Sequence, residues 1–316
     1  MTATPDAIAG AVRERLADAT ALPMPGGGDT KARWQQLTAW AREHVVVGRL
    51  LEAHADATVI LTELAATPPA TGEWWGVWAA EPPQPVVLGE RAHDTTWTLT
   101  GTKPWCSGAG WCTHALMTVR AQEAPDERHL VAVDLRQPGV RIEDTWHNAG
   151  MRASRTWSVH FDDVEATWLG PGSAYLDRPG FWHGGAGVAA CWLGGASAVA
   201  DRLLTTTRDD LLHRAAQGRV RVALTAARWA MQAAAAELDA DPDHLVAARI
   251  RALQIRALVD TAATTVLTET GRALGAGPLC LDPDHAARVA DLTVYLRQGH
   301  GDRDLASLAQ LLEEAP

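Results

Sequence analysis

The spacing of apolar residues divides the chain into three regions. Up to about residue 70, apolar residues recur every three or four positions, as in KARWQQLTAWAREHVVVGRLLEAHADATVILTELAA, a pattern that predicts amphipathic helices. The triplet Gly26-Gly27-Gly28 interrupts the chain before this run, and Pro68-Pro69 ends it. We therefore expect a short helical region over residues 1–71.

The pattern changes to short strands between residues 72 and 170. Trp157, Val159 and Phe161 alternate with Ser158 and His160, which is the period of a half-buried strand. Gly, Pro and Asp separate the predicted strands, and several strands at this spacing indicate a small antiparallel barrel or sandwich. The predicted strands are WWGVWAA, TWTLTG, ALMTVRA, HLVAVDL and RTWSVHF.

Helical periodicity returns over residues 171–316, in long Ala-rich stretches typical of a helical bundle. The last helix is expected to begin near Pro283, because acidic residues suit a helix N-terminus. The predicted fold class is therefore α+β and multidomain. Helices and strands do not alternate, which excludes Rossmann and barrel-type α/β folds. Neither GxGxxG after a strand nor GxxxxGK[ST] occurs.

Composition and charge limit the classes of binding partner that we expect. Of the 316 residues, 47% are hydrophobic and 21% charged, and the formal net charge of −10 comes without a clustered basic face, which argues against nucleic acid. No apolar run is long enough to cross a bilayer, and the N-terminal stretch does not resemble a secretory signal. We expect a cytoplasmic protein that does not bind membranes.

The four cysteines, Cys106, Cys112, Cys191 and Cys280, show no CxxC spacing, and no His/Cys cluster suggests a metal site. We expect free thiols, mostly buried. Tryptophan is abundant, with 14 residues against two Phe and two Tyr. Indole rings stack well on flat ligands but also fill cores, so this excess alone indicates neither.

One stretch is unusual in chemistry. GTKPWCSGAG, residues 101–110, follows a predicted strand and places Trp105 and Ser107 between glycines. A plain turn needs the glycines but not the tryptophan, whereas a backbone that closely approaches a flat ligand would use both. The alternative is a β-hairpin whose tryptophan packs on a helix.

Three stretches resemble the acyl-CoA dehydrogenase family. They are WTLTGTKPWCSGAGWCTHALMTVRA, VAVDLRQPGVRIEDTWHNAGMRASRTWSVHFDDVEATWLG and, more weakly, LGAGPLCLDPDHAARVADLTVYL. The middle stretch is the most specific, through its Gly-Met-Arg-Ala-Ser turn and Phe161-Asp162-Asp163-Val164. The resemblance covers roughly residues 72–300 and implies a flavoprotein oxidoreductase in which FAD lies between a β domain and a helical bundle. It also implies a homodimer or homotetramer.

The resemblance implies a set of cofactor contacts. Trp105 and Ser107 match family positions against the flavin ring, and Ala80 and Glu81 match the strand over its pyrimidine side. A hydroxyl such as that of Ser107 can hydrogen-bond a ring nitrogen or oxygen. Gly275 and Gly277 match the loop that touches the adenosine half of FAD.

Substrate contacts follow from the same resemblance. Arg152, Ser154 and Trp182 are the expected contacts, although Arg152 equally suits a surface ion pair. The expected substrate is a small acyl compound, carried as a thioester of CoA or of a carrier protein.

The family's catalytic glutamate is missing at both positions where it occurs. Counting eight residues from Asp291 of the weaker stretch reaches Gly299, and the alternative position on the first long helix of the bundle aligns near Gly184. His183 and His300 lie next to these positions and are the candidate proton acceptors, since histidine titrates near neutral pH. Solvent exposure or helix capping is the alternative role for each.

Two further departures weaken the match. The N-terminal helical region is shorter than usual in the family, and the arginine that grips the flavin pyrophosphate of a neighbouring subunit has no clear counterpart. Arg219, Arg221 and Arg228 lie nearby and could substitute. Three functions stay open: a dehydrogenase acting on an acyl thioester or related carbonyl compound, a flavin-dependent monooxygenase of the same fold, and a non-catalytic binding or partner subunit.

Overall fold

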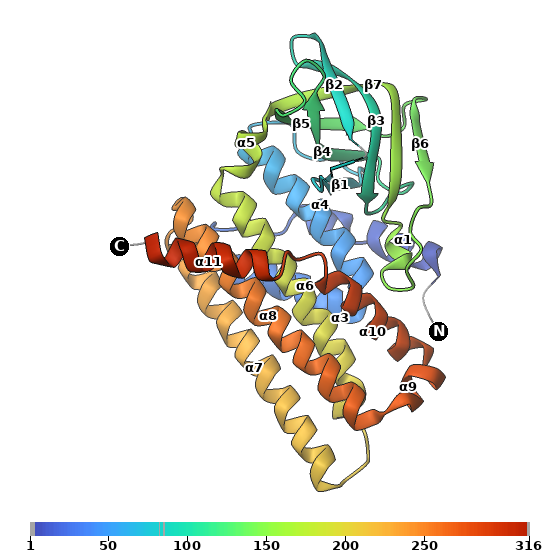
Figure 1. Ribbon diagram of the computed structural model, residues 1–316, viewed down its shortest axis with the longest axis vertical. Helices are drawn as coiled ribbons and strands as arrows, with labels where there is room; N and C mark the ends of the chain where they lie inside the picture. Colours follow the sequence, from blue (N-terminus) through green and yellow to red (C-terminus); the bar gives the residue numbers. More distant parts are fainter. Residues whose placement is uncertain (1–3, 82, 85, 315–316) are drawn as a thin grey trace.

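The computed structural model describes residues 4–81, 83–84 and 86–314 (Figure 1). Residues 1–3 and 315–316, at the outer ends of the first and last predicted regions, lie outside the described residues, as do 82 and 85. The described part begins with a helical layer. Its helices are α1 (Pro5–Arg13), α2 (Leu16–Thr20), α3 (Thr30–Glu43) and α4 (Val45–Glu63).

The apolar run predicted as helical is divided between α3 and α4. His44 is extended at the junction, with φ −154°, and its ring accepts a hydrogen bond from Val46 N, which caps α4. The two helices then pack very closely, because a Cβ at Gly48 would lie only 2.6 Å from Ala41 Cα. Glycine at position 48 therefore allows this crossing.

A β-barrel sits above the helices (Figure 1). Its strands follow the order β1-β4-β2-β3-β7-β5, and an additional β4–β5 pairing closes a five-stranded barrel, with β6 paired to β7. Most pairings are antiparallel, whereas β1–β4 and β2–β4 are parallel. The strands are β1 (Trp75–Trp78), β2 (Val87–His93), β3 (Thr96–Cys106), β4 (His114–Ala121), β5 (Arg128–Asp134), β6 (Val140–Glu143) and β7 (Trp157–Pro171).

The five predicted strands are present, and two more were not predicted. β2 is exposed along its second half, so only its first residues show a buried pattern. β6 is a short edge strand with three exposed residues of four. Neither strand has the alternation that marks a half-buried strand, because each packs little of its surface against the core.

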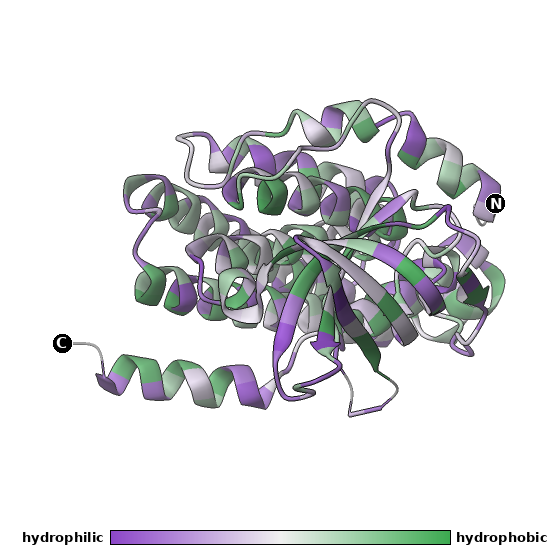
Figure 2. Cartoon of the chain, turned by 90° about the horizontal axis from the view of Figure 1, so that it is seen from above, coloured by the Kyte–Doolittle hydropathy of each residue, from purple (hydrophilic) through white to green (hydrophobic). Residues whose placement is uncertain are grey.

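The C-terminal region is a helical bundle built around α6, which packs against α3, α4, α7, α8 and α10 (Figure 1). The last helix, α11, has no buried residue, and in the view from above it runs along one side of the bundle to the C-terminus (Figure 2). The predicted α+β fold class is confirmed. The helices are α5 (Gly172–Leu176), α6 (Pro179–Leu204), α7 (Leu211–Ala240), α8 (Leu245–Leu274), α9 (Ala276–Leu281), α10 (Pro283–Leu296) and α11 (Asp302–Glu314).

Candidate active site

The end of β3 presents an exposed aromatic ring beside a buried hydroxyl. Trp105 is 54% exposed, and its φ of 59° lies in the left-handed region that L-residues avoid. Ser107 is buried two residues later, and Gly108 and Gly110 also have positive φ. The loop rests on α4, because a Cβ at Gly108 would lie 3.4 Å from Leu50 Cδ2. A flat apolar face and a small hydroxyl therefore lie within three residues of each other.

The Ser107 hydroxyl ends a chain of hydroxyl groups whose protons are ordered. Ser154 Oγ donates to the Met151 carbonyl at 2.6 Å, so its oxygen accepts from Thr156 Oγ1, also at 2.6 Å. Thr156 in turn accepts from Ser107 Oγ at 3.0 Å. A hydroxyl has one proton. Ser107 therefore keeps only acceptor capacity for a neighbouring molecule.

In the segment after β1, residues Ala80 and Glu81, the main chain is more available to a ligand than the Glu81 carboxylate is. Ala80 is exposed, and Glu81 is partly buried. Glu81 Oε2 accepts from Arg120 Nε at 3.0 Å and lies 2.9 Å from Arg128 Nε. These two arginines neutralise the carboxylate, so the main chain is what this segment presents to a neighbouring ring.

The turn between β6 and β7 connects residues 101–110, which we call the tryptophan hairpin, to the C-terminal helices. Ser154 O accepts from Gly108 N at 2.8 Å on the hairpin side. On the other side, Asp291 Oδ1 of α10 accepts from Met151 N at 2.6 Å, and a Cβ at Gly150 would lie 2.2 Å from the main chain of α10. Burial raises the pKa of Asp291 to about 6. A continuous set of contacts thus runs from α10 to the tryptophan hairpin.

The predicted substrate contacts lie in different environments. Arg152 is exposed, donates to Trp146 O at 2.9 Å and lies 3.7 Å from Asp144. Ser154 is fully buried, and its hydroxyl belongs to the ordered chain. Trp182 is half-buried on α6, with the Arg249 guanidinium 5.2 Å from its ring centre. The three are not brought to one place by hydrogen bonds or ring contacts among the described residues.

Gly184 and Gly299, the positions aligned in the sequence analysis with the family's glutamate, both lie near Arg256 of α8. Arg256 Nη1 donates to Gly185 O at 3.2 Å, next to Gly184, and a Cβ at Gly299 would lie 3.4 Å from Arg256 Nη2. On its other side, a Cβ at Gly184 would lie 2.5 Å from Asp56 Oδ1 of α4. A cation and a carboxylate from other helices therefore flank these glycines.

The two candidate histidines contact different elements. His183 is buried, and its Nε2 lies 2.9 Å from Pro242 O in the loop between α7 and α8. Burial lowers the pKa of His183, which favours the neutral ring. The His300 side chain is 73% exposed, and its Nδ1 lies 3.5 Å from Asp304 Oδ1. His300 is therefore available to a solvent-borne ligand, whereas His183 contacts the main chain of a loop.

A row of charged residues on α4 escaped the sequence analysis. We call Arg49, Glu52, Asp56 and Glu63 the α4 charged stripe, because their spacing places them on one helix face. Glu52 is only 4% exposed and pairs with Arg49 at 2.5 Å, while Glu63 pairs with Arg178 at the start of α6. Their spacing of three, four and seven residues inside an otherwise apolar run was the available cue. Charges at core-facing positions of a helix need partners and often mark function.

The stripe fits against α6 because α6 has glycines where the two helices meet. A Cβ at Gly180 would collide with the Glu63 carboxylate, and one at Gly184 would collide with Asp56. Burial raises the pKa of both Glu52 and Asp56. The Gly-rich sequence of α6 thus makes room for ionisable groups inside the helical layer.

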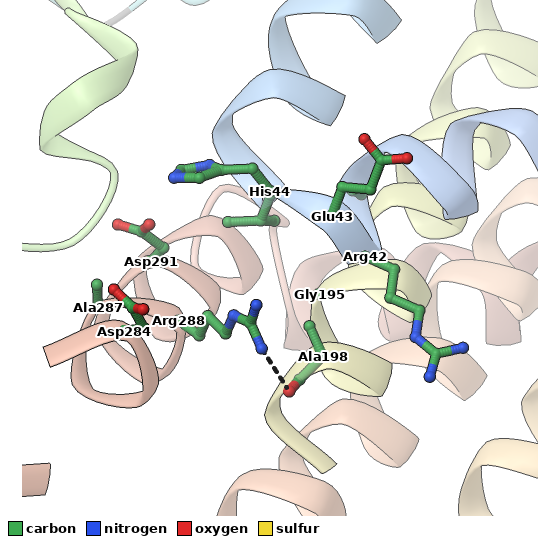
Figure 3. Close-up of a pocket in the computed structure, with 11 residues that line it drawn as sticks. Arg42, Glu43, His44, Gly195, Ala198, Asp284, Ala287, Arg288 and Asp291 are labelled. Carbon is green, nitrogen blue, oxygen red and sulfur yellow. Dashed lines mark hydrogen bonds between the residues drawn. The ribbon is translucent and has the colours of Figure 1, made fainter. Parts of the chain in front are cut away.

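A cavity of about 180 Å³ opens beside α10, between the α3–α4 junction and α6. Figure 3 shows His44 of the junction on one wall and Asp284, Arg288 and Asp291 of α10 on another. Arg288 Nη1 donates to Ala198 O of α6 at 3.4 Å. This charged cavity was not predicted, because its walls come from three distant parts of the chain. It adjoins the turn that Asp291 holds.

The predicted adenosine contacts are remote from the hairpin within one chain. Gly275 and Gly277 are exposed at the junction of α8 and α9, and Figure 1 shows α9 at the end of the bundle away from the barrel. Gly275 has a φ of 67° and ends α8.

The arginines considered as pyrophosphate ligands lie along α7. Arg219 pairs with Glu269 of α8 at 2.7 Å, Arg228 Nη2 lies 3.5 Å from Ser197 Oγ, and Arg221 is exposed. Over the described ranges, no group of His, Cys, Asp and Glu has the arrangement of a metal site. No helix in that part of the chain is long and apolar enough to cross a membrane.

The fold and the sequence of the barrel agree on one class of protein. Residues 85–164 match the family model described as acyl-CoA dehydrogenase, middle domain, which confirms the resemblance expected from the sequence. Amino sugar nitrososynthase DnmZ of Streptomyces peucetius is 36% identical over 74 residues, which are 23% of this chain and 18% of that protein. The matched segment is thus less than a fifth of this curated relative.

Solved structures extend the likeness to the whole fold. KijD3 in complex with FMN and dTDP-3-amino-2,3,6-trideoxy-4-keto-3-methyl-D-glucose is similar with a TM-score of 0.79 and 18% identity, over 96% of this chain and 86% of that one. Butyryl-CoA dehydrogenase from Megasphaera elsdenii is similar with a TM-score of 0.78 and 16% identity, over 97% of this chain and 89% of that one. Dibenzothiophene monooxygenase (TdsC) from Paenibacillus sp. A11-2 is similar with a TM-score of 0.76 and 16% identity, over 98% of this chain and 95% of that one. The chain therefore has the acyl-CoA dehydrogenase fold.

Proposed function

We propose that the protein is a flavin-dependent oxidoreductase of the oxygenase type, acting on a small polar substrate that bears an amine or hydroxyl group. The observation that carries the oxygenase assignment is glycine at both positions 184 and 299. A dehydrogenase of this fold needs a carboxylate there to remove a carbon-bound proton, whereas an oxygenase does not depend on that step. Similarity to an amino sugar nitrososynthase and to a monooxygenase supports the same choice.

The tryptophan hairpin fits a flavin ring. The exposed face of Trp105 suits stacking on a planar tricycle, and the positive φ of Gly108 and Gly110 keeps the loop compact beneath it. Ser107 Oγ, left as an acceptor by the ordered hydroxyl chain, suits a ring N–H, and the main chain at Ala80 and Glu81 suits the polar edge. When bound, the flavin would supply the two-electron chemistry and, in its reduced form, the reaction with oxygen.

The choice between FMN and FAD is a separate part of the proposal. FAD would need Gly275 and Gly277 of a second chain for its adenosine half, whereas FMN would be held by the hairpin alone. KijD3 was solved with FMN, and the α7 arginines are partly engaged in other contacts, so we propose FMN. Exposed Val222 and Trp229 on α7 support self-association into a homodimer or homotetramer.

A second candidate is oxidation of an acyl thioester. Similarity to butyryl-CoA dehydrogenase supports it, and the histidines near positions 184 and 299 would then have to accept the proton. His300 suits this role better than His183, because it is exposed whereas His183 lies against Pro242 O.

The test compares these activities on one preparation. Purified protein is titrated with FMN and FAD by fluorescence, then supplied with a flavin reductase, NADH, oxygen and a dTDP-linked 3-amino sugar. We expect flavin binding and oxygen-dependent conversion of the amine, followed by mass spectrometry. Anaerobic bleaching of bound oxidised flavin by acyl-CoA thioesters would instead establish the dehydrogenase. Absence of flavin binding would leave a non-catalytic subunit as the conclusion.

A further inference from the structure

We propose that Asp56 of α4 supplies the carboxylate that positions 184 and 299 lack, and accepts the proton of the substrate's amine or hydroxyl group. This assignment rests on the proposed function. Its geometric basis is the space beside Gly184, where a Cβ would lie 2.5 Å from Asp56 Oδ1. The Asp56 carboxylate thus occupies the place where a side chain at residue 184 would begin.

Asp56 differs from the other acids of the α4 charged stripe because it is not committed to a partner. Glu52 pairs with Arg49, and Glu63 pairs with Arg178. Among the described residues, Asp56 forms neither a side-chain hydrogen bond nor an ion pair within 4 Å, and its side chain keeps partial access to solvent. A carboxylate is an acceptor only. Its ligand must therefore bring an N–H or O–H group.

The surroundings stabilise a carboxylate there without using its oxygen atoms. Arg178, Arg33 and Arg49 are the cations that act on Asp56. Within the part of the chain that the structure describes, Nε and Nη2 of Arg178 are buried and have no hydrogen-bond partner. Glu52 and Glu63 also act on Asp56, as like charges, and each pairs with one of these arginines. Tyr175 lies close on the side of α5. The buried N–H groups of Arg178 and the carboxylate of Asp56 are therefore polar groups whose hydrogen bonds a polar ligand would complete.

Burial makes Asp56 a better proton acceptor than a surface aspartate, because it raises the pKa of the carboxyl group. In the step proposed, one proton passes from the substrate N–H or O–H to a carboxylate oxygen of Asp56, and the electron pair of that bond remains on nitrogen or oxygen. The proton then passes to water, to which the half-buried residue keeps partial access. No electron is transferred in this step.

The experiment uses the full chain with FMN, the flavin reductase system and two probes, a dTDP-linked 3-amino sugar and its 3-hydroxy counterpart. Asp56→Asn keeps the size of the side chain but cannot accept the proton. We expect turnover to fall at least about 100-fold, as for loss of a general base, with FMN affinity unchanged. The acid limb of the pH–rate profile should disappear in the variant. Asp18→Asn, a surface change on α2, is the matched control.

Moving the carboxylate from position 56 to position 184 distinguishes a catalytic role of Asp56 from a structural one. Asp56→Ala vacates the space beside Gly184, and the double variant Asp56→Ala/Gly184→Asp returns a carboxylate from α6. We expect the double variant to recover at least about tenfold of the turnover lost in Asp56→Ala. In the wild type, infrared difference spectra on adding the productive probe should show protonation of a carboxyl group.

Each result decides the proposal. Wild-type turnover by Asp56→Asn with FMN bound, or absence of the infrared change, overturns the role of Asp56 and leaves the oxygenase intact. If Asp56→Asn does not fold, the infrared measurement on the wild type decides alone. A wild type that binds no flavin and converts neither probe overturns the proposed function and this assignment together. Preference for one probe identifies the substrate group as amine or hydroxyl, and either preference supports the proposal.

Discussion

Replacing Asp291 with asparagine should stabilise the protein at neutral and alkaline pH. Burial raises the pKa of Asp291 from its ordinary 3.8 to about 6, and the side chain is only 9% exposed. That difference corresponds to about 3 kcal/mol as a ceiling. Since the folded pKa lies above the unfolded one, the neutral carboxyl stabilises the fold below about pH 4, and this contribution is lost as the pH rises through 6.

Asparagine keeps an oxygen acceptor for Met151 N, which now donates to Asp291 Oδ1 at 2.6 Å, but it does not ionise. We expect Asp291→Asn to raise the free energy of unfolding by about 1–3 kcal/mol at pH 8 and by nothing at pH 4. Guanidinium unfolding at pH 4, 6 and 8 measures this. Asp291→Ala, which leaves Met151 N–H unpaired, should lose about 1–3 kcal/mol at pH 4. Its loss should be smaller at pH 8, because alanine also removes the carboxyl group that ionises in the wild type. A stability of Asp291→Asn that does not vary with pH relative to the wild type would refute the reasoning.

Three further predictions concern other contacts. Trp105→Ala should weaken flavin binding by about 2- to 10-fold in a fluorescence titration, with an unchanged unfolding midpoint, because the exposed indole is proposed to stack on the flavin and contributes little to the core. The wild type should lose up to about 3 kcal/mol of stability between pH 6.5 and 4, because burial lowers the pKa of His54 to about 4 and the neutral ring accepts from Trp75 N; His54→Asn should remove this acid sensitivity in pH-dependent unfolding. Gly194→Ala should lower the melting temperature, since its Cβ would lie 2.3 Å from Thr38 O, whereas Gly218→Ala, with open space around it, should raise stability by about 0.5–1 kcal/mol.

The sequence predicted most of the architecture because hydrophobic periodicity depends on which faces are buried. A helix start near Pro283 was predicted from the acidic residues there, and α10 begins at Pro283. The prediction that this helix is the last was wrong, because α11 follows it. The exposed strand β2 lacked such a pattern and was missed. The residues proposed to contact the flavin at Trp105 and Ser107 are nearly consecutive, so a local motif was enough to single them out.

The remainder of the site depends on contacts between distant segments. Asp56 meets Gly184 across two helices, and Asp291 meets Met151 across the interface of barrel and bundle. Single-sequence periodicity gives the face of a helix but not its neighbour. His183 was chosen for its place in the chain, yet its ring lies against the carbonyl of Pro242, a partner that only the fold reveals.

The left-handed backbone at Trp105 has a consequence for any effort to make this protein more robust. Every L-residue with a Cβ meets the same steric penalty at that position, of about 1–2 kcal/mol, and glycine alone escapes it. Selection for heat resistance would therefore favour glycine at position 105 and would remove the surface proposed to bind the flavin ring. Engineering for thermostability should keep Trp105 unchanged and measure flavin binding together with the melting temperature.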